Sequence, residues 1–439
     1  MLETLRNAFK IKDLRKKIFY TLFIIFIFRL GSRIPVPFLD PSALAQGLSM
    51  DAENTVFFLL NTFSGGAFQY GAIFAMSVTP YINSSIIMQL LTVAIPALER
   101  MQKEGEEGRK KIAQITRYVT VVLGLLQGLA FYFYLKSAGI VYSYSGFWAV
   151  FAAVVIILAF TAGTALMMWL GEQINDKGIG NGISILLFAG ILSRGPQAFL
   201  TLYYQFSNGI KNSDFTQVIT PIGVIILFLL VTAFIVFMTD AERRIRIQYA
   251  KKVVGRKMYG GQTTHMPIKV NIGGVIPIIF ASTVLALPST IISFSGMNAE
   301  NSNFWYPLLN FFAINSVPYI ILYMLFIFGF SYFYVTIQYN PLEMSNNLRR
   351  NNGAVPGIRP GKPTADYIKK ILSRITFIGA IFLTVIALLP IIAGLVSGTN
   401  GTGITIGGTS MLIMVGVALE TVKAIESQMM MRHYKGFLD

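Results

Sequence analysis

Apolar stretches alternate with polar stretches along the whole of this chain, and ten of the apolar stretches approach or exceed the length of a membrane-spanning helix. About 20 consecutive apolar residues form a helix long enough to cross the hydrocarbon core of a bilayer. The predicted spans cover residues 18–34, 74–95, 115–136, 147–170, 182–202, 216–238, 272–292, 317–338, 372–395 and 406–425. The pattern therefore predicts an all-α membrane protein with ten transmembrane helices and with both termini on one side.

One apolar segment is too short to form an eleventh span. Residues 55–68 have the sequence TVFFLLNTFSGGAF, which the pair Gly65 and Gly66 interrupts. Broken backbone of this kind is tolerated at membrane depth only where protein shields it or where it lines a cavity. The segment is either a re-entrant half-helix or an amphipathic helix that lies on the outer surface. The residues themselves leave both interpretations open.

Composition and charge agree with a bilayer environment. Of the residues, 54% are hydrophobic and only 13% are charged, and the net charge is +16. All but five of the 36 Lys and Arg residues lie in the two terminal segments or in loops that follow even-numbered spans. Because positive charge accumulates on the cytoplasmic side, these segments are predicted to be cytoplasmic. The five exceptions are Arg29, Arg33, Lys136, Arg194 and Lys211.

The chain offers little reactive chemistry. It has no cysteine, and its two histidines, His265 and His433, are far apart in the sequence. We therefore predict no disulfide, redox centre, metal site or cofactor. Serine, histidine and carboxylate residues show no spacing typical of a nucleophile and its base, which argues against an enzyme.

Few polar side chains lie within the predicted spans. The second span is an exception, since it carries Thr79, Asn83, Ser84 and Gln89, and packing between helices is the ordinary reason for such residues. Glu420, near the inner end of the tenth span, either marks an ion path or is a snorkelling residue paired near the interface. This scarcity of charge argues against a secondary transporter, which needs ion-coordinating groups at the midplane.

Two of the predicted cytoplasmic loops are long as well as basic. They cover residues 239–271 and 339–370. Membrane topology alone accounts for a few positive charges near the spans, whereas the surplus permits docking to an acidic or RNA-rich partner, and both interpretations remain open. In the second loop the stretch GAVPGIRPGKPT contains three prolines and presents Arg359 at its tip. Ordered loops that project a rigid feature often carry function.

Several long motifs occur in the order that one known family shows. They are NTFSGGAF, TPYINSSIIMQLLT, KEGEEGRKKIAQITRY, MWLGEQINDKGIGNGISI, THMPIKVNIGGVIP, YNPLEMSNNLRRNNGAVPGIRPGKPT and GGTSMLI. With them the chain resembles the SecY family, the pore subunits of the bacterial Sec protein-conducting channel, from about residue 10 to 430. The resemblance implies two inverted halves, residues 1–202 and 203–439, around an hourglass pore. It also implies a passive channel that moves unfolded polypeptide across the plasma membrane and releases membrane segments into lipid.

The resemblance assigns three sets of residues to the pore. The family's pore ring of aliphatic side chains matches Val78, Ile82, Ile183, Leu187, Ile279 and Ile413. Its plug, a short helix that closes the outer funnel, matches Phe57, Phe58, Leu59, Leu60, Asn61, Phe63, Ser64, Gly65, Gly66 and Phe68. This match favours the buried interpretation of the broken segment. Spans two and seven match the lateral gate, whose closure we expect Thr79, Asn83 and Gln89 to support through interhelical hydrogen bonds.

The resemblance also implies partners. They are the SecE and SecG subunits, the motor ATPase SecA, the ribosome with its RNA, signal peptides, nascent polypeptide and membrane lipid. No cofactor is implied. The residues expected to dock the motor or the ribosome are Arg243, Arg244, Lys251, Arg256 and Lys257 in the first long loop and Arg359 in the second.

Overall fold

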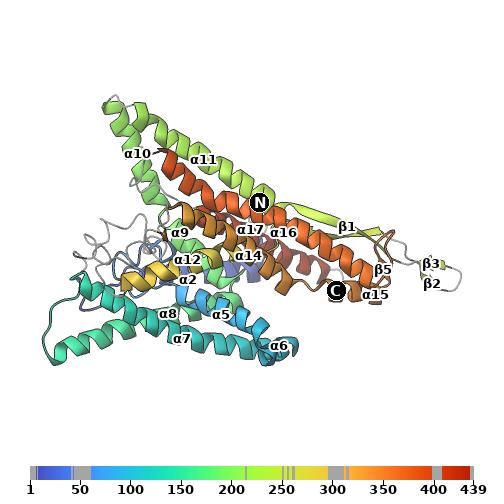
Figure 1. Cartoon of the computed structure of the whole chain (residues 1–439), viewed down its shortest axis with the longest axis horizontal. Helices are drawn as coiled ribbons and strands as arrows, with labels where there is room; N and C mark the ends of the chain where they lie inside the picture. The colour runs from blue at the N-terminus through green and yellow to red at the C-terminus, as the bar shows by residue number, and fades with distance from the viewer. Residues whose placement is uncertain are drawn as a thin grey trace.

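The computed structural model describes most of the chain in atomic detail. The described residues are 6, 8–40, 43, 61–212, 215–249, 252–254, 257–259, 263–294, 311–312, 316–397 and 408–435. Long helices dominate them, and their lengthwise arrangement is visible in Figure 1. The helices are α2 Lys12–Gly31, α5 Thr79–Ala94, α6 Pro96–Lys103, α7 Glu106–Ser137, α8 Phe147–Lys177, α9 Gly182–Leu192, α10 Gly195–Lys211, α11 Phe215–Asp240, α12 Ile276–Phe294, α14 Val317–Gln338, α15 Pro341–Arg350, α16 Lys362–Ser397 and α17 Gly408–Lys435.

Every predicted span overlaps one or two of these helices, so the prediction of an all-α membrane fold is confirmed. By length and apolar composition, six helical stretches of the described residues are able to cross a membrane, with α9 and α10 counted as one stretch and α14 and α15 as another. The number is seven if the bent pair α5 and α6 forms one span. The total of ten spans stays a prediction.

The second span begins later and ends more abruptly than the hydropathy pattern indicates. Residues 64–78 form a succession of turns, and α5 begins only at Thr79. The helix ends at Ala94, because Pro96 disfavours helical backbone in the residue before it, and α6 continues at an angle of 100°. With 16 residues α5 is about 24 Å long, which is shorter than the hydrocarbon core of about 30 Å.

The fifth span is also broken, although it was predicted as one helix over residues 182–202. It consists of α9 and α10, which are separated at Ser193 and Arg194. Pro196 stands in the first turn of α10, where the missing amide hydrogen of proline costs no intrahelical bond. The break places two polar residues beside the irregular segment 61–78.

Three hydrophobic clusters organise the helices. One contains residues of α11, α12, α14, α16 and α17, and another contains residues between positions 36 and 160. The third joins the two groups, because it combines residues of α2, α8 and α9 with Ile413 and Val417 of α17. In Figure 1, α7 and α8 lie along one side, α11 and α16 lie along the other, and α9 lies between them. The division into halves at residue 202 and their inverted relation stay predictions.

Two small antiparallel sheets form from the two long basic loops, for which the sequence analysis predicted no secondary structure. One has the order β4-β1-β5, and the other pairs β2 with β3. The strands are β1 Glu242–Tyr249, β2 Lys252–Val254, β3 Lys257–Tyr259, β4 Thr263–Lys269 and β5 Gly353–Ala354. In β1 the sequence ERRIRIQY alternates, so that Ile245 and Ile247 are buried while Arg244 and Arg246 are exposed.

The three-stranded sheet joins the two long basic loops to each other and to the helices. Strand β1 pairs with β4 from its own loop and with β5 from the second loop. Beneath it, Ile245, Ile268 and Val355 pack with Ile368 and Leu372 of α16. The sheet and α15 lie toward the right in Figure 1, whereas the connection between α7 and α8 lies at the left end.

Candidate functional site

The six residues that the sequence analysis placed in a pore ring come together in one apolar cluster. Val78, Leu187 and Ile413 are buried members of that cluster, with relative exposures of 1%, 5% and 2%. Ile82, Ile183 and Ile279 are partly buried and pack against it. Positions separated by more than 300 residues in the sequence therefore meet in one cluster.

The elements that supply these side chains are positioned by packing. Helices α5, α9, α12 and α17 each contribute at least one of the six, and Val78 lies in the turn that leads into α5. The surrounding members, such as Ile24, Phe28 and Leu170, are also apolar. A narrow apolar constriction resists the passage of water and ions by dewetting, and it offers a sliding peptide no fixed hydrogen bonds. The apolar side chains of the cluster therefore suit a seal against water and ions that still lets peptides of many different sequences pass.

The broken apolar segment is described from Asn61 onwards, and this part is buried. Thr62, Ser64, Ala67 and Phe68 have relative exposures of 6% or less. Residues 61–63 form a short helical piece, and turns follow. The described part therefore does not lie on the outer surface, as the amphipathic interpretation required. Phe57, Phe58, Leu59 and Leu60, the remaining residues of the predicted plug, lie outside the described residues.

Within this segment, backbone geometry accounts for the paired glycines. Gly65 and Gly66 have φ angles of +64° and +87°, which glycine adopts without the steric cost that other residues incur. The amide of Gly66 donates to the carbonyl oxygen of Asn61 at 2.9 Å, and the amide of Phe68 donates to Ser64 Oγ at 3.1 Å. Local hydrogen bonds thus satisfy part of the irregular backbone inside the protein.

The polar residues of the second span do not make the interhelical bonds that we expected from Thr79 and Asn83. Thr79 Oγ1 and Asn83 Oδ1 are buried and have no hydrogen-bond partner among the described residues. Gln89 is partly exposed, and its carbonyl oxygen accepts from Thr92 Oγ1 of the same helix at 2.7 Å. An interhelical bond of this span comes from Ser84 instead, whose Oγ donates to the carbonyl oxygen of Thr116 in α7 at 2.8 Å.

This difference has an energetic consequence for the predicted gate. An unsatisfied buried acceptor costs about 1–3 kcal/mol, so Thr79 and Asn83 weaken the packing around the start of α5 rather than strengthen it. Helix α7 packs against both α5 and α12, the helices that overlap the second and seventh predicted spans and therefore belong to the predicted gate.

The predicted docking residues of the first loop are partly described. Arg243 and Arg244 lie exposed on β1, and Arg244 Nε forms an ion pair with Glu242 Oε1 at 2.7 Å. Lys257 lies in β3, whereas Lys251 and Arg256 lie outside the described residues. Strand pairing thus holds the described arginines on one small platform.

Arg359 lies in the loop between β5 and α16, which two buried hydroxyl groups hold in place. Ser345 Oγ donates to the carbonyl oxygen of Gly361 at 2.7 Å, and Thr364 Oγ1 donates to that of Arg359 at 2.8 Å. Ser345 and Thr364 have relative exposures of 2% and 3%, whereas Arg359 is exposed. The sequence analysis ascribed the rigidity of this loop to its prolines, and it missed both hydroxyl contacts. Their only sequence signal was their position within a long motif.

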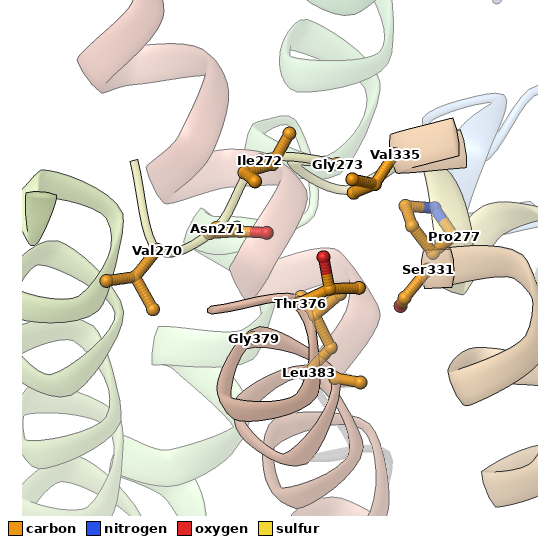
Figure 2. A pocket seen from close by; sticks show the side chains of 11 residues that line it. Val270, Asn271, Ile272, Gly273, Pro277, Ser331, Val335, Thr376, Gly379 and Leu383 are labelled. Carbon is orange, nitrogen blue, oxygen red and sulfur yellow. The ribbon is translucent and has the colours of Figure 1, made fainter. Parts of the chain in front are cut away.

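A small cavity lies where the link between β4 and α12 meets α14 and α16. Figure 2 shows Asn271 pointing into it, with Ser331 and Thr376 opposite. Both hydroxyl groups donate to carbonyl oxygens of their own helices. The cavity has a volume of about 10 Å³, which is room for about one water molecule. Because sites for small molecules measure about 300–1,000 Å³, it is not a solute site.

Glu420 is exposed on α17, which fits a residue near the membrane surface better than an ion path. Its neighbour Lys423 pairs with Asp240 of α11, with 2.5 Å between Lys423 Nζ and Asp240 Oδ1. In the described part of the chain, no group of three or more His, Cys, Asp and Glu residues is arranged to hold a metal ion.

Taken together, the helices and the aliphatic cluster define a multi-pass helical membrane protein with a central apolar cluster and a buried broken segment that packs against it. The family model for SecY matches residues 72–422. The chain belongs to the SecY family.

Relatives along the whole chain agree with this membership. The chain is 44% identical to the protein translocase subunit SecY of Bacillus subtilis and 43% identical to that of Streptomyces coelicolor, with 100% of each chain covered in both comparisons. It is also 43% identical to the SecY subunit of Thermotoga maritima, covering 100% of this chain and 98% of that one.

Solved structures share the fold. A protein-conducting channel matches with a TM-score of 0.66 at 18% identity, covering 94% of this chain and 92% of the other. Sec61 in the canine ribosome–channel complex from the endoplasmic reticulum matches with a TM-score of 0.62 at 17% identity, with the same coverage. A SecY structure studied for a plug domain that stabilises the closed channel matches with a TM-score of 0.61.

Proposed function

We propose that this protein is the pore-forming subunit of a bacterial protein translocase. It conducts unfolded polypeptides across the plasma membrane and releases membrane segments laterally into the lipid. It acts as a passive channel, and a partner supplies the energy. The observation that carries this proposal is the convergence of the six predicted ring residues into one apolar cluster between helices from both parts of the chain.

The plug and the gate complete the proposed channel. Residues 57–68 form the plug that closes the outer side of the ring, and the burial of Thr62, Ser64 and Phe68 supports this role. Helices α5 and α12 form the lateral gate. The unpaired acceptors of Thr79 and Asn83 support a gate that opens at low cost, since water or a passenger polypeptide satisfies them when the helices part.

The proposed orientation places both termini and the two long basic loops in the cytoplasm. Their positive charge supports this orientation. The exposed arginines of β1 and Arg359 then face the partners, which are the motor ATPase SecA and the ribosome with its RNA. SecE and SecG are the proposed companion subunits in the membrane.

Transport by purified components tests the function. The complex with its companion subunits is reconstituted into vesicles, and the motor, ATP and an unfolded secretory precursor are added outside. We expect precursor to become protected from protease inside the vesicles, and we expect no protection without ATP. A precursor that lacks its signal sequence is the matched control. Protection that is equal with and without this protein would contradict the proposed function.

A further inference from the structure

Five positively charged residues lie outside the segments that are predicted to be cytoplasmic, and three of these five contact the same segment of the chain. These five are Arg29, Arg33, Lys136, Arg194 and Lys211. In the structure the three arginines all contact residues 61–70, which include the base of the proposed plug. The two lysines are exposed. The positive-inside rule does not explain arginines on the outer side, because positive charge there opposes the orientation in which basic loops face the cytoplasm.

The first contact is made from α2. Arg29 Nη1 donates to the carbonyl oxygen of Gly65 at 2.9 Å. Ser193 Oγ lies 3.4 Å from the same oxygen, but its hydroxyl donates to the nearer carbonyl oxygen of Gly190 at 2.6 Å, so Arg29 is the main donor to Gly65. The acceptor belongs to the glycine with a φ of +64°, which turns the backbone at this point. A guanidinium suits this task, because its planar fork reaches a backbone oxygen while its charge stays partly hydrated.

The second contact is made from the break between α9 and α10. Arg194 Nη1 donates to Thr62 Oγ1 at 2.9 Å. Thr62 is 6% exposed, and Arg194 is partly buried. A hydrogen bond that involves a charged donor is about twice as strong as one between neutral groups. The break in the fifth span therefore places a strong donor against the base of the plug.

The third contact holds the far end of the same segment. The guanidinium carbon of Arg33 lies 4.4 Å from the centre of the Tyr70 ring, which is a cation–π geometry. Between these anchors the backbone lies very close to α9. A Cβ atom added at Gly190 would lie 2.6 Å from the carbonyl oxygen of Phe63, so a side chain there would displace the segment.

We propose that Arg29, Arg33 and Arg194 form a latch that holds residues 61–70 in place and keeps the plug closed until a passenger displaces it. The inference rests on the proposed channel function, and it adds the contacts that set the strength of closure. The three latch contacts are two hydrogen bonds and one cation–π contact, and they add to the apolar packing of Ala67 and Phe68 in the same segment. Such contacts are replaceable by water, so the closed plug is held firmly but reversibly.

Ion conductance of the reconstituted complex in a planar bilayer tests the latch. The test variant combines Arg29→Gln with Arg194→Gln, and the matched control combines Lys136→Gln with Lys211→Gln. Both variants remove two outer positive charges, but only the first removes contacts to residues 61–70. We expect the latch variant to leak ions at least roughly tenfold more than the unmodified channel, since each lost bond has a charged donor. We expect the control to stay closed.

Two further measurements distinguish the latch from a general loss of fold and from a plug that closes without it. The latch variant should still transport precursor, and leak together with lost transport would overturn the proposal by indicating a general loss of fold. A channel that lacks residues 57–68 should leak, and the latch substitutions should add nothing in that background. If the truncated channel leaks while the latch variant stays closed, the latch is overturned and the plug stands. If the truncated channel also stays closed, both the plug and the latch are overturned.

Discussion

Replacing Arg359 with glutamate is expected to abolish transport driven by the motor. Arg359 is exposed in a loop whose backbone is fixed by Ser345 and Thr364, so the substitution changes charge at a held position without disturbing the core. Reversing one charge at a desolvated, paired contact costs several kcal/mol. We therefore expect transport to fall by on the order of a hundredfold.

The measurement is the rate of precursor protection in vesicles that contain equal amounts of complex. Arg350→Glu is the matched control, because it reverses an exposed charge at the end of α15, close to the same loop. The control should retain most of the rate. Near-normal transport by the Arg359 variant, or an equal loss in both variants, would refute a specific role for Arg359.

Placing asparagine at both Ile82 and Ile279 is expected to weaken the seal and to relax the selection of signal sequences. Both side chains pack against the apolar cluster from different helices, α5 and α12. Burying an amide without a partner costs about 1–3 kcal/mol, and polar groups attract water into a constriction that excludes it by dewetting. The closed arrangement therefore loses stability relative to the open one.

Two assays follow this change. Ion conductance of the closed channel should rise, and a precursor with a defective signal sequence should be transported faster than by the unmodified channel. The control carries Ile82→Leu and Ile279→Leu, which keep the volume and the apolar character. A double asparagine variant that behaves like the leucine control in both assays would count against the ring.

The helices were the most predictable feature, because a bilayer imposes one simple rule on the sequence. Every backbone polar group must be satisfied within the membrane, so long apolar stretches form helices. The rule failed where protein shields irregular backbone. Residues 74–78 are as apolar as a helix, yet they form turns whose side chains Phe74, Ala75 and Met76 are buried among other helices. Hydropathy does not distinguish these two environments.

The prediction of the site residues depended on the resemblance to a family and not on any local sequence pattern. Val78 or Ile413 alone is an ordinary packed aliphatic residue, and only the structure brings the six together. The contacts of Arg29 and Arg194 could not be predicted from the sequence either, because they join residues that are 36 and 132 positions apart. The charge pattern still left a usable signal, since it singled out these arginines as exceptions to the positive-inside rule.

The central claim is that polypeptide passes through the aliphatic cluster, and cross-linking tests it most directly. The chain has no cysteine, so a single introduced thiol reports one position without background. Ile82→Cys, Ile279→Cys and Ile413→Cys place the thiol in the cluster, and Leu229→Cys places it at an exposed position of α11 that is 60% accessible. A precursor with one cysteine is stalled halfway across the membrane, and the sample is then oxidised.

We predict disulfide adducts between the precursor and each of the three cluster positions, and none at position 229. Adducts should also require the motor and ATP, because the precursor enters the cluster only during transport. If the stalled precursor forms no adduct at the cluster, or reacts equally at position 229, the polypeptide does not pass through this constriction and the account is contradicted.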